Sequence, residues 1–216
     1  MASPPLTFVP GAAGLGRFWD PVRERLPPEL SHAALDWPGF GGSPSLGVDS
    51  YDSLIDHIAA GLPPRGAVIG QSMGGFVALQ LALRYPERVS HLVLTVAAAG
   101  VDMARHGAFD WRNDSGSREP AKPAWIYERL ADASAQLERI RIPVLLLWAT
   151  RDRLSPIGVA EQLRDSMPDA RLVSFDSDDH WFVRRFAEPV SAEIVRHVQT
   201  PDTPRLAAAA ARLVGS

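Results

Sequence analysis

The residues with the clearest chemical potential lie in the segment GQSMG at positions 70–74, which has the pattern G-x-S-x-G. The apolar run Ala67–Gly70 before it predicts a buried strand, and Met73–Arg84 after it predicts a helix. The two glycines and the serine of this pattern also occur together by chance in unrelated sequences. The prediction therefore depends on the strand-turn-helix context. A serine at such a turn is held in a strained conformation with its hydroxyl exposed. The segment therefore predicts a nucleophile elbow with Ser72 as nucleophile.

A serine hydroxyl is a weak nucleophile unless a base removes its proton, and the base needs an orienting group. Asp152 follows the predicted strand Pro143–Ala149 and precedes a turn, so we expect it to be the orienting acid. An aspartate in such a place also serves as a loop or helix cap. Asp102, just past the preceding predicted strand, is the alternative acid.

The base is expected after the last predicted strand, Arg171–Phe175, where His180 lies. Histidine has an unperturbed pKa that suits proton transfer near neutrality. Among the six histidines, His180 combines this place after a strand with the chain order serine, acid, histidine. The sequence therefore predicts Ser72, Asp152 and His180 as the catalytic residues.

Acyl transfer also needs backbone N–H groups that bind the developing oxyanion. The N–H of Met73, the residue after the nucleophile, is the first expected donor. The second is expected from the loop PGAAG at residues 10–14, where small residues let the backbone approach a substrate oxygen. Ala12 is the preferred donor in this loop and Ala13 is the alternative.

The elements that must position these residues alternate between strand and helix patterns. Short apolar runs predict six strands, and most are continuous, as in parallel sheets covered on both faces. This order predicts an α/β fold with a doubly wound, mainly parallel sheet, whose sites lie at the carboxyl ends of the strands. The expected strands are Leu6–Pro10, Ala33–Trp37, Ala67–Gly70, His91–Ala97, Pro143–Ala149 and Arg171–Phe175. The expected helices are Phe18–Arg25, Tyr51–Ala60, Met73–Arg84, Val159–Ser166 and Phe186–Val198.

The segment Val101–Arg141 is far longer than an ordinary connection between two strands. It combines charged residues with aromatic ones and predicts a short lid inserted over the strand ends. Phe109, Trp111 and Trp125 are candidates for substrate binding, and packing of the lid onto the body is the alternative for each.

Residues 1–199 are expected to form a single domain that includes the lid. Residues 200–216 form a C-terminal tail, and its alanine-rich part predicts a short helix.

Composition excludes several classes of function. With 46% hydrophobic and 22% charged residues, the chain of 216 residues resembles a soluble globular protein. A net charge of -3 without a basic and aromatic cluster argues against nucleic acid as a partner. The absence of cysteine excludes disulfides and thiolate catalysis. We expect no metal, no cofactor and no membrane partner, a cytoplasmic location, and a monomer or weak homodimer that acts on a small molecule.

The chain resembles the α/β-hydrolase fold superfamily over most of residues 6–198. The matching segments are FVPGAAG, LDWPGFGGSPS, IGQSMGG, RYPERVSHLVL, LLLWATRDRLSP and SDDHW. The resemblance implies Ser72 as nucleophile, Asp152 as acid, His180 as base, and the backbone N–H groups of Met73 and Ala12 as the oxyanion hole.

Three features depart from the family pattern. Pro10 stands where the family commonly has a histidine that braces the oxyanion loop. The chain opens on what the family counts as its third strand, so we expect the two N-terminal strands of the family to be missing and six strands to remain. The lid is short and charged, which argues against a long-chain lipid substrate.

The sequence thus predicts a carboxylic-ester hydrolase that cleaves a small ester, thioester or related acyl substrate through an acyl-enzyme. The same three residues also serve C–C bond hydrolysis or elimination in some members of the family. A small-molecule receptor with little turnover is a further alternative, because fold alone does not determine function.

Overall fold

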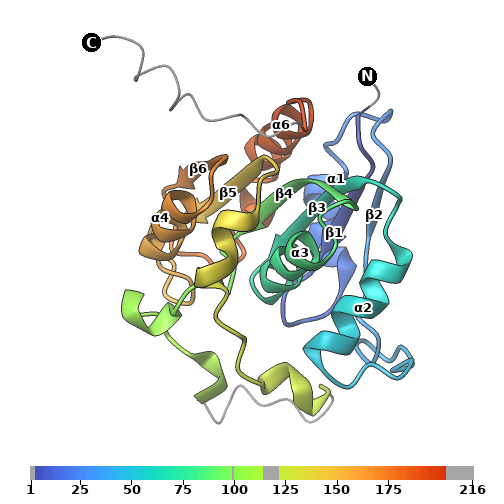
Figure 1. Cartoon of the computed structure of the whole chain (residues 1–216), viewed down its shortest axis with the longest axis vertical. Coiled ribbons are helices and arrows are strands. Elements are labelled where there is room, and N and C mark those ends of the chain that lie inside the picture. Colours follow the sequence, from blue (N-terminus) through green and yellow to red (C-terminus); the bar gives the residue numbers. More distant parts are fainter. Residues whose placement is uncertain (1–2, 99, 114–121, 203–216) are drawn as a thin grey trace.

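The computed structural model describes residues 3–98, 100–113 and 122–202. Its centre is a six-stranded sheet in the order β2-β1-β3-β4-β5-β6, in which every neighbouring pair is parallel (Figure 1). The strands are β1 (Leu6–Val9), β2 (His32–Ala34), β3 (Gly66–Gln71), β4 (Val89–Thr95), β5 (Val144–Ala149) and β6 (Ala170–Phe175). The predicted α/β fold with a six-stranded parallel sheet is confirmed.

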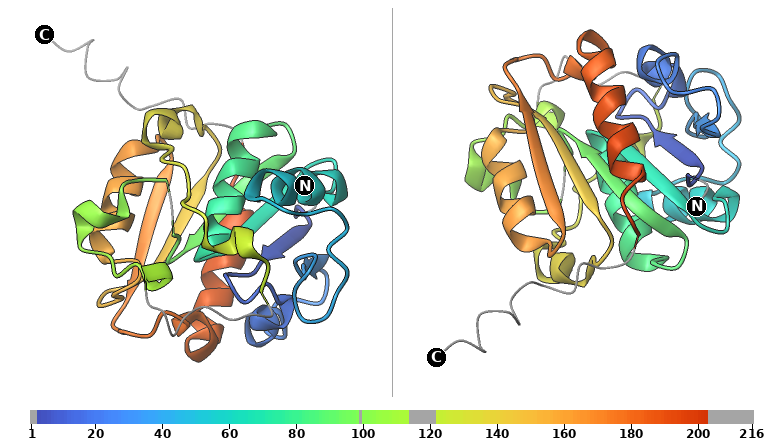
Figure 2. Two further views of the ribbon diagram at one scale, coloured as in Figure 1. Left: turned by 90° about the horizontal axis from the view of Figure 1, so that it is seen from below. Right: turned by 90° about the horizontal axis from the view of Figure 1, so that it is seen from above.

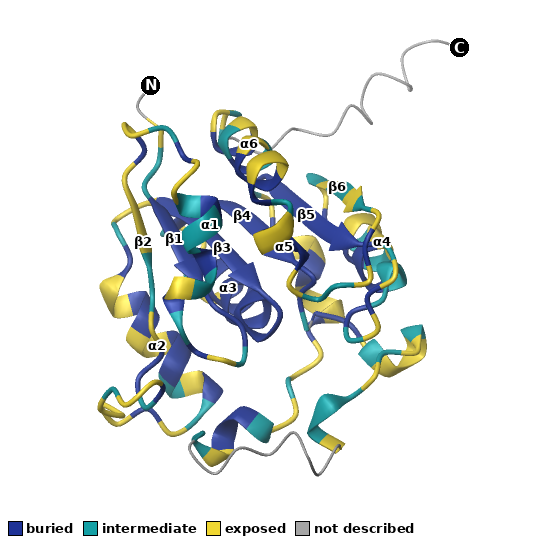
Figure 3. Cartoon of the chain, turned by 180° about the vertical axis from the view of Figure 1, so that it is seen from behind, coloured by how far each residue is buried: buried dark blue, intermediate teal, exposed yellow. Residues whose placement is uncertain are grey.

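Helices cover both faces of the sheet, as the views along its edges show (Figure 2). One layer contains α2 (Tyr51–Gly61), α3 (Met73–Arg84) and α4 (Ile157–Ser166). The other contains α1 (Asp20–Arg23), α5 (Phe182–Arg185) and α6 (Ala187–Val198) (Figure 3). The central strands are therefore shielded from water on both sides.

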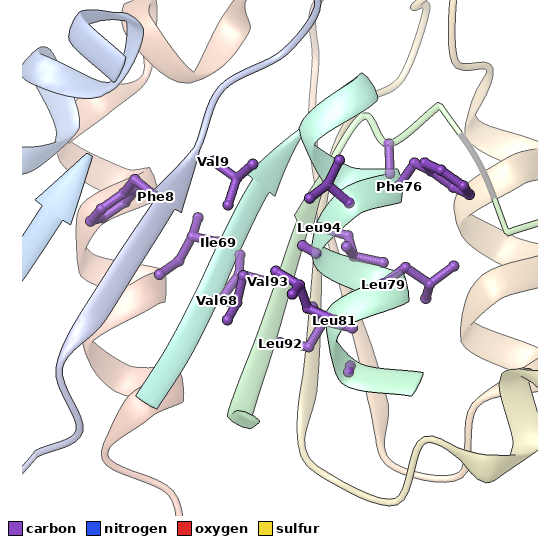
Figure 4. Close-up of a cluster of buried hydrophobic side chains, with 14 of the residues drawn as sticks. Phe8, Val9, Val68, Ile69, Phe76, Leu79, Leu81, Leu92, Val93 and Leu94 are labelled. Atoms are coloured by element: carbon purple, nitrogen blue, oxygen red, sulfur yellow. The ribbon is translucent and has the colours of Figure 1, made fainter. Parts of the chain in front are cut away.

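This double cover explains the continuous apolar runs in the sequence. Every residue of β3, β4 and β5 is buried. Side chains of β1, β3 and β4 pack together with those of α3 in one cluster (Figure 4). Burial of such aliphatic and aromatic side chains stabilises the fold by about 1.5–3 kcal/mol each. The core thereby fixes the carboxyl ends of the strands, next to which the predicted site residues lie.

Local signals fix the ends of the helices beside the site. Ser50 caps α2, because its hydroxyl accepts a hydrogen bond from Ser53 N at 3.2 Å and Ser53 Oγ accepts one from Ser50 N at 3.0 Å. α3 begins directly after Ser72 and ends at Arg84, two residues before Pro86.

Two predicted elements are shorter than expected. β2 ends at Ala34, because Asp36 accepts a hydrogen bond from Gly16 N at 2.7 Å and Trp37 N bonds to Gly14 O at 2.7 Å. These bonds pull the chain towards the loop after β1. The helix expected at Phe18–Arg25 is divided into a 3₁₀ turn, Gly16–Trp19, and the single turn of α1.

The segment between β4 and β5 forms 3₁₀ helices and loops that lie beyond the carboxyl ends of the strands (Figure 1). Its 3₁₀ helices in the described part are Met103–His106, Trp111–Asn113, Ala124–Tyr127 and Ser134–Arg139. The helix expected in the alanine-rich tail lies outside the described residues. Among the helices of the described ranges, none is long and apolar enough to cross a membrane.

Candidate active site

Ser72 lies at the turn between β3 and α3 with φ 53° and ψ −120°, a strained conformation for a residue with a side chain. Backbone hydrogen bonds hold it there. Its N–H donates to Thr95 O at 3.0 Å, and its carbonyl accepts from Gly75 N at 2.8 Å and from Ala98 N at 3.0 Å. The serine is thus fixed between the ends of β3 and β4.

The glycines of the motif are required because backbones meet at this turn. A Cβ at Gly70 would lie 2.2 Å from Gly74 O, and a Cβ at Gly74 would lie 2.2 Å from Pro10 O. Side chains at either position would force strand and helix apart. Close packing of the backbone therefore requires both glycines of the motif at the predicted elbow.

Asp152 and His180 lie together at the ends of β5 and β6. His180 Nδ1 is 2.6 Å from Asp152 Oδ2, although 28 residues separate the two in the chain. The other carboxylate oxygen, Oδ1, accepts the backbone N–H of Leu154 at 2.7 Å and of Ser155 at 3.1 Å. The Asp152 side chain is 1% exposed, so these three partners satisfy a buried carboxylate.

This geometry determines which imidazole nitrogen is free to react. The bond from Nδ1 to the carboxylate fixes the ring and leaves Nε2 as the nitrogen that can accept a proton. Ser72 Oγ and His180 Nε2 form no hydrogen bond in the structure. In enzymes without bound substrate, the distance between a nucleophile and its base is often too long for a hydrogen bond. The histidine backbone is nevertheless tied to the elbow, because Gln71 Nε2 donates to His180 O at 3.3 Å.

The alternative acid has a different local role. Asp102 is exposed and its carboxylate accepts the backbone N–H of Ala104 at 3.1 Å, which caps the 3₁₀ helix Met103–His106. The structure therefore brings Asp152, and not Asp102, to His180.

The loop of residues 10–14, called here the oxyanion loop, lies against the nucleophile. A Cβ at Gly11 would be 2.3 Å from Gln71 Oε1 and 3.2 Å from Ser72 Cβ, so the glycine lets the loop lie close to both residues. Within the described residues, the backbone N–H groups of Ala12, Ala13 and Met73 donate to no backbone carbonyl. These three N–H groups therefore stay the candidates for the oxyanion hole, and the choice between Ala12 and Ala13 stays open.

A cavity of about 390 Å³ lies between Met73, next to the elbow serine, and the lid segment, and Ser72 and His180 are not among the residues that line it. On the body it is lined by Met73, Ala98 and Leu154, and on the lid Phe109 and Trp111 contribute aromatic surface. Its volume is that of a site for a small molecule.

The lid side of the cavity is also polar. Arg112 binds Asp110 through two hydrogen bonds, Nε to Oδ1 at 2.7 Å and Nη2 to Oδ2 at 3.0 Å. These bonds hold the pKa of Asp110 below its ordinary value. Asp102, Arg129 and Asp132 lie on the same wall, so the far end of the cavity favours polar groups.

The three lid aromatics differ in their surroundings. Trp125 is 4% exposed, and its ring lies 5.1 Å from Tyr51 and 5.7 Å from Phe40. It packs the lid onto the body and does not line the cavity of the described residues. Trp111 packs against Tyr127 at 5.5 Å and Phe109 is 46% exposed.

Sequence reasoning missed two features of this site. Gln71 occupies a variable position of the motif, so the pattern did not constrain it. The pair of Asp110 and Arg112 was hidden among the other charges of the lid, and only their spacing of two residues signalled that they meet.

Comparison with known proteins agrees with this geometry. The family model of the alpha/beta hydrolase fold matches residues 4–137, and a model described as TAP-like protein matches residues 113–210. The chain belongs to the α/β-hydrolase fold family.

Curated relatives in this family are esterases by name. The pimeloyl-[acyl-carrier protein] methyl ester esterase of Aromatoleum aromaticum is 31% identical, over 83% of this chain and 92% of that protein. The enzyme of the same name from Nitrosomonas europaea is 29% identical, over 82% and 88%. The predicted class, a hydrolase of carboxylic esters, is confirmed.

Solved structures show the same fold with more than one chemistry. An esterase from Exiguobacterium antarcticum has a TM-score of 0.75 and 19% identity, covering 93% of this chain and 94% of that chain. A meta-cleavage product hydrolase from Pseudomonas fluorescens IP01 has a TM-score of 0.73 and 20% identity, covering 90% of each chain. At this identity the likeness concerns the fold alone.

Proposed function

We propose that this hydrolase uses Ser72 as nucleophile, His180 as general base and acid, and Asp152 as the group that orients His180. The observation that carries the proposal is the 2.6 Å contact between His180 Nδ1 and buried Asp152, beside a serine at a strained elbow. This arrangement leaves Nε2 to take the hydroxyl proton.

The reaction then proceeds in two halves. Ser72 Oγ attacks the ester carbonyl carbon while His180 Nε2 takes its proton, and the carbonyl oxygen becomes an oxyanion bound by N–H of Met73 and of Ala12 or Ala13. The C–O bond to the alcohol breaks as His180 protonates the leaving oxygen. His180 then takes a proton from water, whose oxygen attacks the acyl carbon. The bond to Ser72 Oγ breaks as His180 returns the proton to Oγ, which releases the acid and free Ser72.

The proposed substrate is a small carboxylic ester whose acyl part carries a polar end. The cavity of about 390 Å³ accepts a short acyl chain beside Phe109 and Trp111, and its charged wall on the lid receives polar groups. The curated relatives are named for a methyl ester of pimeloyl-[acyl-carrier protein]. Methyl esters of dicarboxylic acyl groups, free or attached to a carrier protein, are therefore the first substrates to test.

Labelling with a fluorophosphonate tests the nucleophile directly. We expect one modified residue, Ser72, identified by peptide mass spectrometry, and no labelling of Ser72→Ala. Turnover of a panel of methyl and p-nitrophenyl esters then tests the substrate class. Labelling at another residue would overturn the assignment of the nucleophile.

Hydrolysis of a C–C bond is the second candidate, because meta-cleavage product hydrolases share the fold. A labelled Ser72 together with negligible turnover of every ester, but cleavage of 2-hydroxy-6-oxo-6-phenylhexa-2,4-dienoate, for which another neighbour of the same fold is named, would favour that chemistry.

A further inference from the structure

Gln71 is the last residue of β3 and directly precedes the nucleophile. Its side chain is buried, with 2% of the residue exposed. Burial of an amide is costly unless the group finds partners. The contacts of this amide therefore indicate what it does.

The amide nitrogen faces the segment of residues 176–181 that carries His180, called here the histidine loop. Gln71 Nε2 donates to His180 O at 3.3 Å, across 109 residues of sequence. Within the described part of the chain, no other hydrogen bond joins residues 70–75 to the histidine loop. Asp152 fixes the ring of His180, Gln71 holds the backbone carbonyl of His180, and Arg151 N–H holds Ser177 O of the same loop at 2.9 Å.

The amide oxygen faces the oxyanion loop. A Cβ at Gly11 would lie only 2.3 Å from Gln71 Oε1, so the glycine allows this loop to rest on the amide. One buried side chain therefore contacts both segments that must meet a substrate at Ser72. These segments are far apart in the chain and share no helix or strand.

We propose that Gln71 is the positioning residue that sets the spacing of the oxyanion loop and His180 around Ser72. The inference rests on the proposed function, in which His180 Nε2 takes the Ser72 proton. No hydrogen bond joins those two atoms in the structure, so their approach depends on the backbone of the histidine loop. Misplacement of a reacting group by about 1 Å can cost about 10²-fold in rate.

The variant Gln71→Met keeps the length of the side chain and removes both polar atoms. Gln80→Met is the matched control, because Gln80 is also buried but bonds Arg84 within α3, at 3.2 Å. For short p-nitrophenyl esters we expect Gln71→Met to lower kcat about 10- to 100-fold with little change in KM. The rate of fluorophosphonate labelling should fall in parallel, while Gln80→Met keeps wild-type values.

A donor restored at this position should restore the rate. Gln71→His places a ring N–H near the carbonyl of His180, and we expect it to recover most of the lost kcat. Wild-type kcat in Gln71→Met, or a loss no greater than in Gln80→Met, would overturn the proposal. If Gln71→Met does not fold, Gln71→Leu replaces it, since it is apolar, of similar size and lacks the donor.

Ser72→Ala, measured beside these variants, separates the two hypotheses. If Ser72→Ala keeps wild-type turnover, the proposed function fails. If Ser72→Ala is inactive while Gln71→Met has normal kcat, only the role of Gln71 fails.

Discussion

At the scale of single residues, the site depends on the strained backbone conformation of Ser72. A residue with a side chain at φ 53° costs about 1–3 kcal/mol of backbone strain, and three backbone hydrogen bonds at Ser72 offset it. The strain keeps the hydroxyl at the end of the strand rather than within the helix. Retention of this strain suits a serine with a chemical role.

Substitution of the three proposed catalytic residues should give non-additive losses. We expect Ser72→Ala and His180→Ala each to lower kcat by about 10⁶, with no further loss in the double variant, because the two act in one step. Asp152→Asn should cost about 10⁴, since the imidazole loses its orientation. Steady-state kinetics on a short ester measures each effect.

Asp102→Asn is the control for this series. Its carboxylate caps a lid helix and lines the cavity wall without contacting His180, so we expect a change in kcat of less than about tenfold, with any larger effect in KM. A greater loss in Asp102→Asn than in Asp152→Asn would show that the acid is misassigned.

Chain order was enough to predict that Asp152 and His180 lie just after strands whose ends meet, and the structure brings them to 2.6 Å. It was not enough to predict Gln71, because a variable motif position reveals no contact with a residue 109 positions away. Local patterns predict which residues lie at the end of a strand, whereas contacts between loops depend on the packing of the whole sheet.

At the scale of elements, the lid is attached to the body at both of its halves. His106 Nε2 lies 2.6 Å from Gln162 Oε1 on α4. Tyr51 on α2 donates its hydroxyl to Ile126 O at 3.0 Å. Together with buried Trp125, these contacts make the described part of the lid a fixed wall of the cavity.

Substitution of the lid aromatics should therefore affect different properties, stability for Trp125 and substrate preference for Trp111. Trp125→Ala removes a buried ring and should lower the free energy of unfolding by about 3–5 kcal/mol, measured by urea denaturation. Trp111→Ala should destabilise the protein less and shift kcat/KM towards longer acyl chains, because Trp111 lines the cavity. Each buried CH₂ is worth about 0.8 kcal/mol, or roughly fourfold in kcat/KM.

A wild-type enzyme with an optimum at long chains, or with activation by a lipid interface, would contradict this account of the lid. Equal chain-length profiles for wild type and Trp111→Ala would contradict the role given to that side chain.

Strand predictions agreed with the structure to within one residue at β1, β3, β5 and β6, and least at β2. β4 begins and ends two residues earlier than the predicted His91–Ala97. The run at Ala33–Trp37 overestimated β2, because after Leu35, whose N–H still donates to Phe8 O at 3.0 Å, the chain turns to the loop after β1 through Asp36 and Trp37. The 3₁₀ turns of the lid were not predicted, since one turn is too short to show a period.

At the scale of the whole molecule, two histidines couple the sheet to its last helix. His91 on β4 and His197 on α6 are buried, with ring centroids 5.3 Å apart. His91 Nε2 contacts Thr200 O at 3.0 Å, and His197 Nε2 has no hydrogen-bond partner among the described residues. A charge on either ring would be poorly solvated here.

Burial, and then the neighbouring His91, lowers the pKa of His197 to about 3. Burial also lowers the pKa of His91, against an opposing effect of its bond to Thr200. Both histidines have a pKa near 6.5 when unfolded, so below that pH the unfolded chain binds protons that the folded chain does not. The part of the free energy of unfolding that depends on these histidines is therefore fully present above about pH 6.5. It is lost as the pH decreases towards 3.

Replacement of His197 by a residue that binds no proton should make the free energy of unfolding depend less on pH. In wild type, His197 contributes a slope of about 1.4 kcal/mol per pH unit to the free energy of unfolding between about pH 6 and 4. His197→Leu should have a slope smaller by about that amount, because leucine fills the site without binding a proton. Urea denaturation followed by circular dichroism at about pH 7, 6, 5 and 4 measures the slope, and exposed His57→Gln is the control. Equal slopes in His197→Leu and wild type would show that His197 is solvated and charged in the folded protein, and would remove the coupling of α6 to pH.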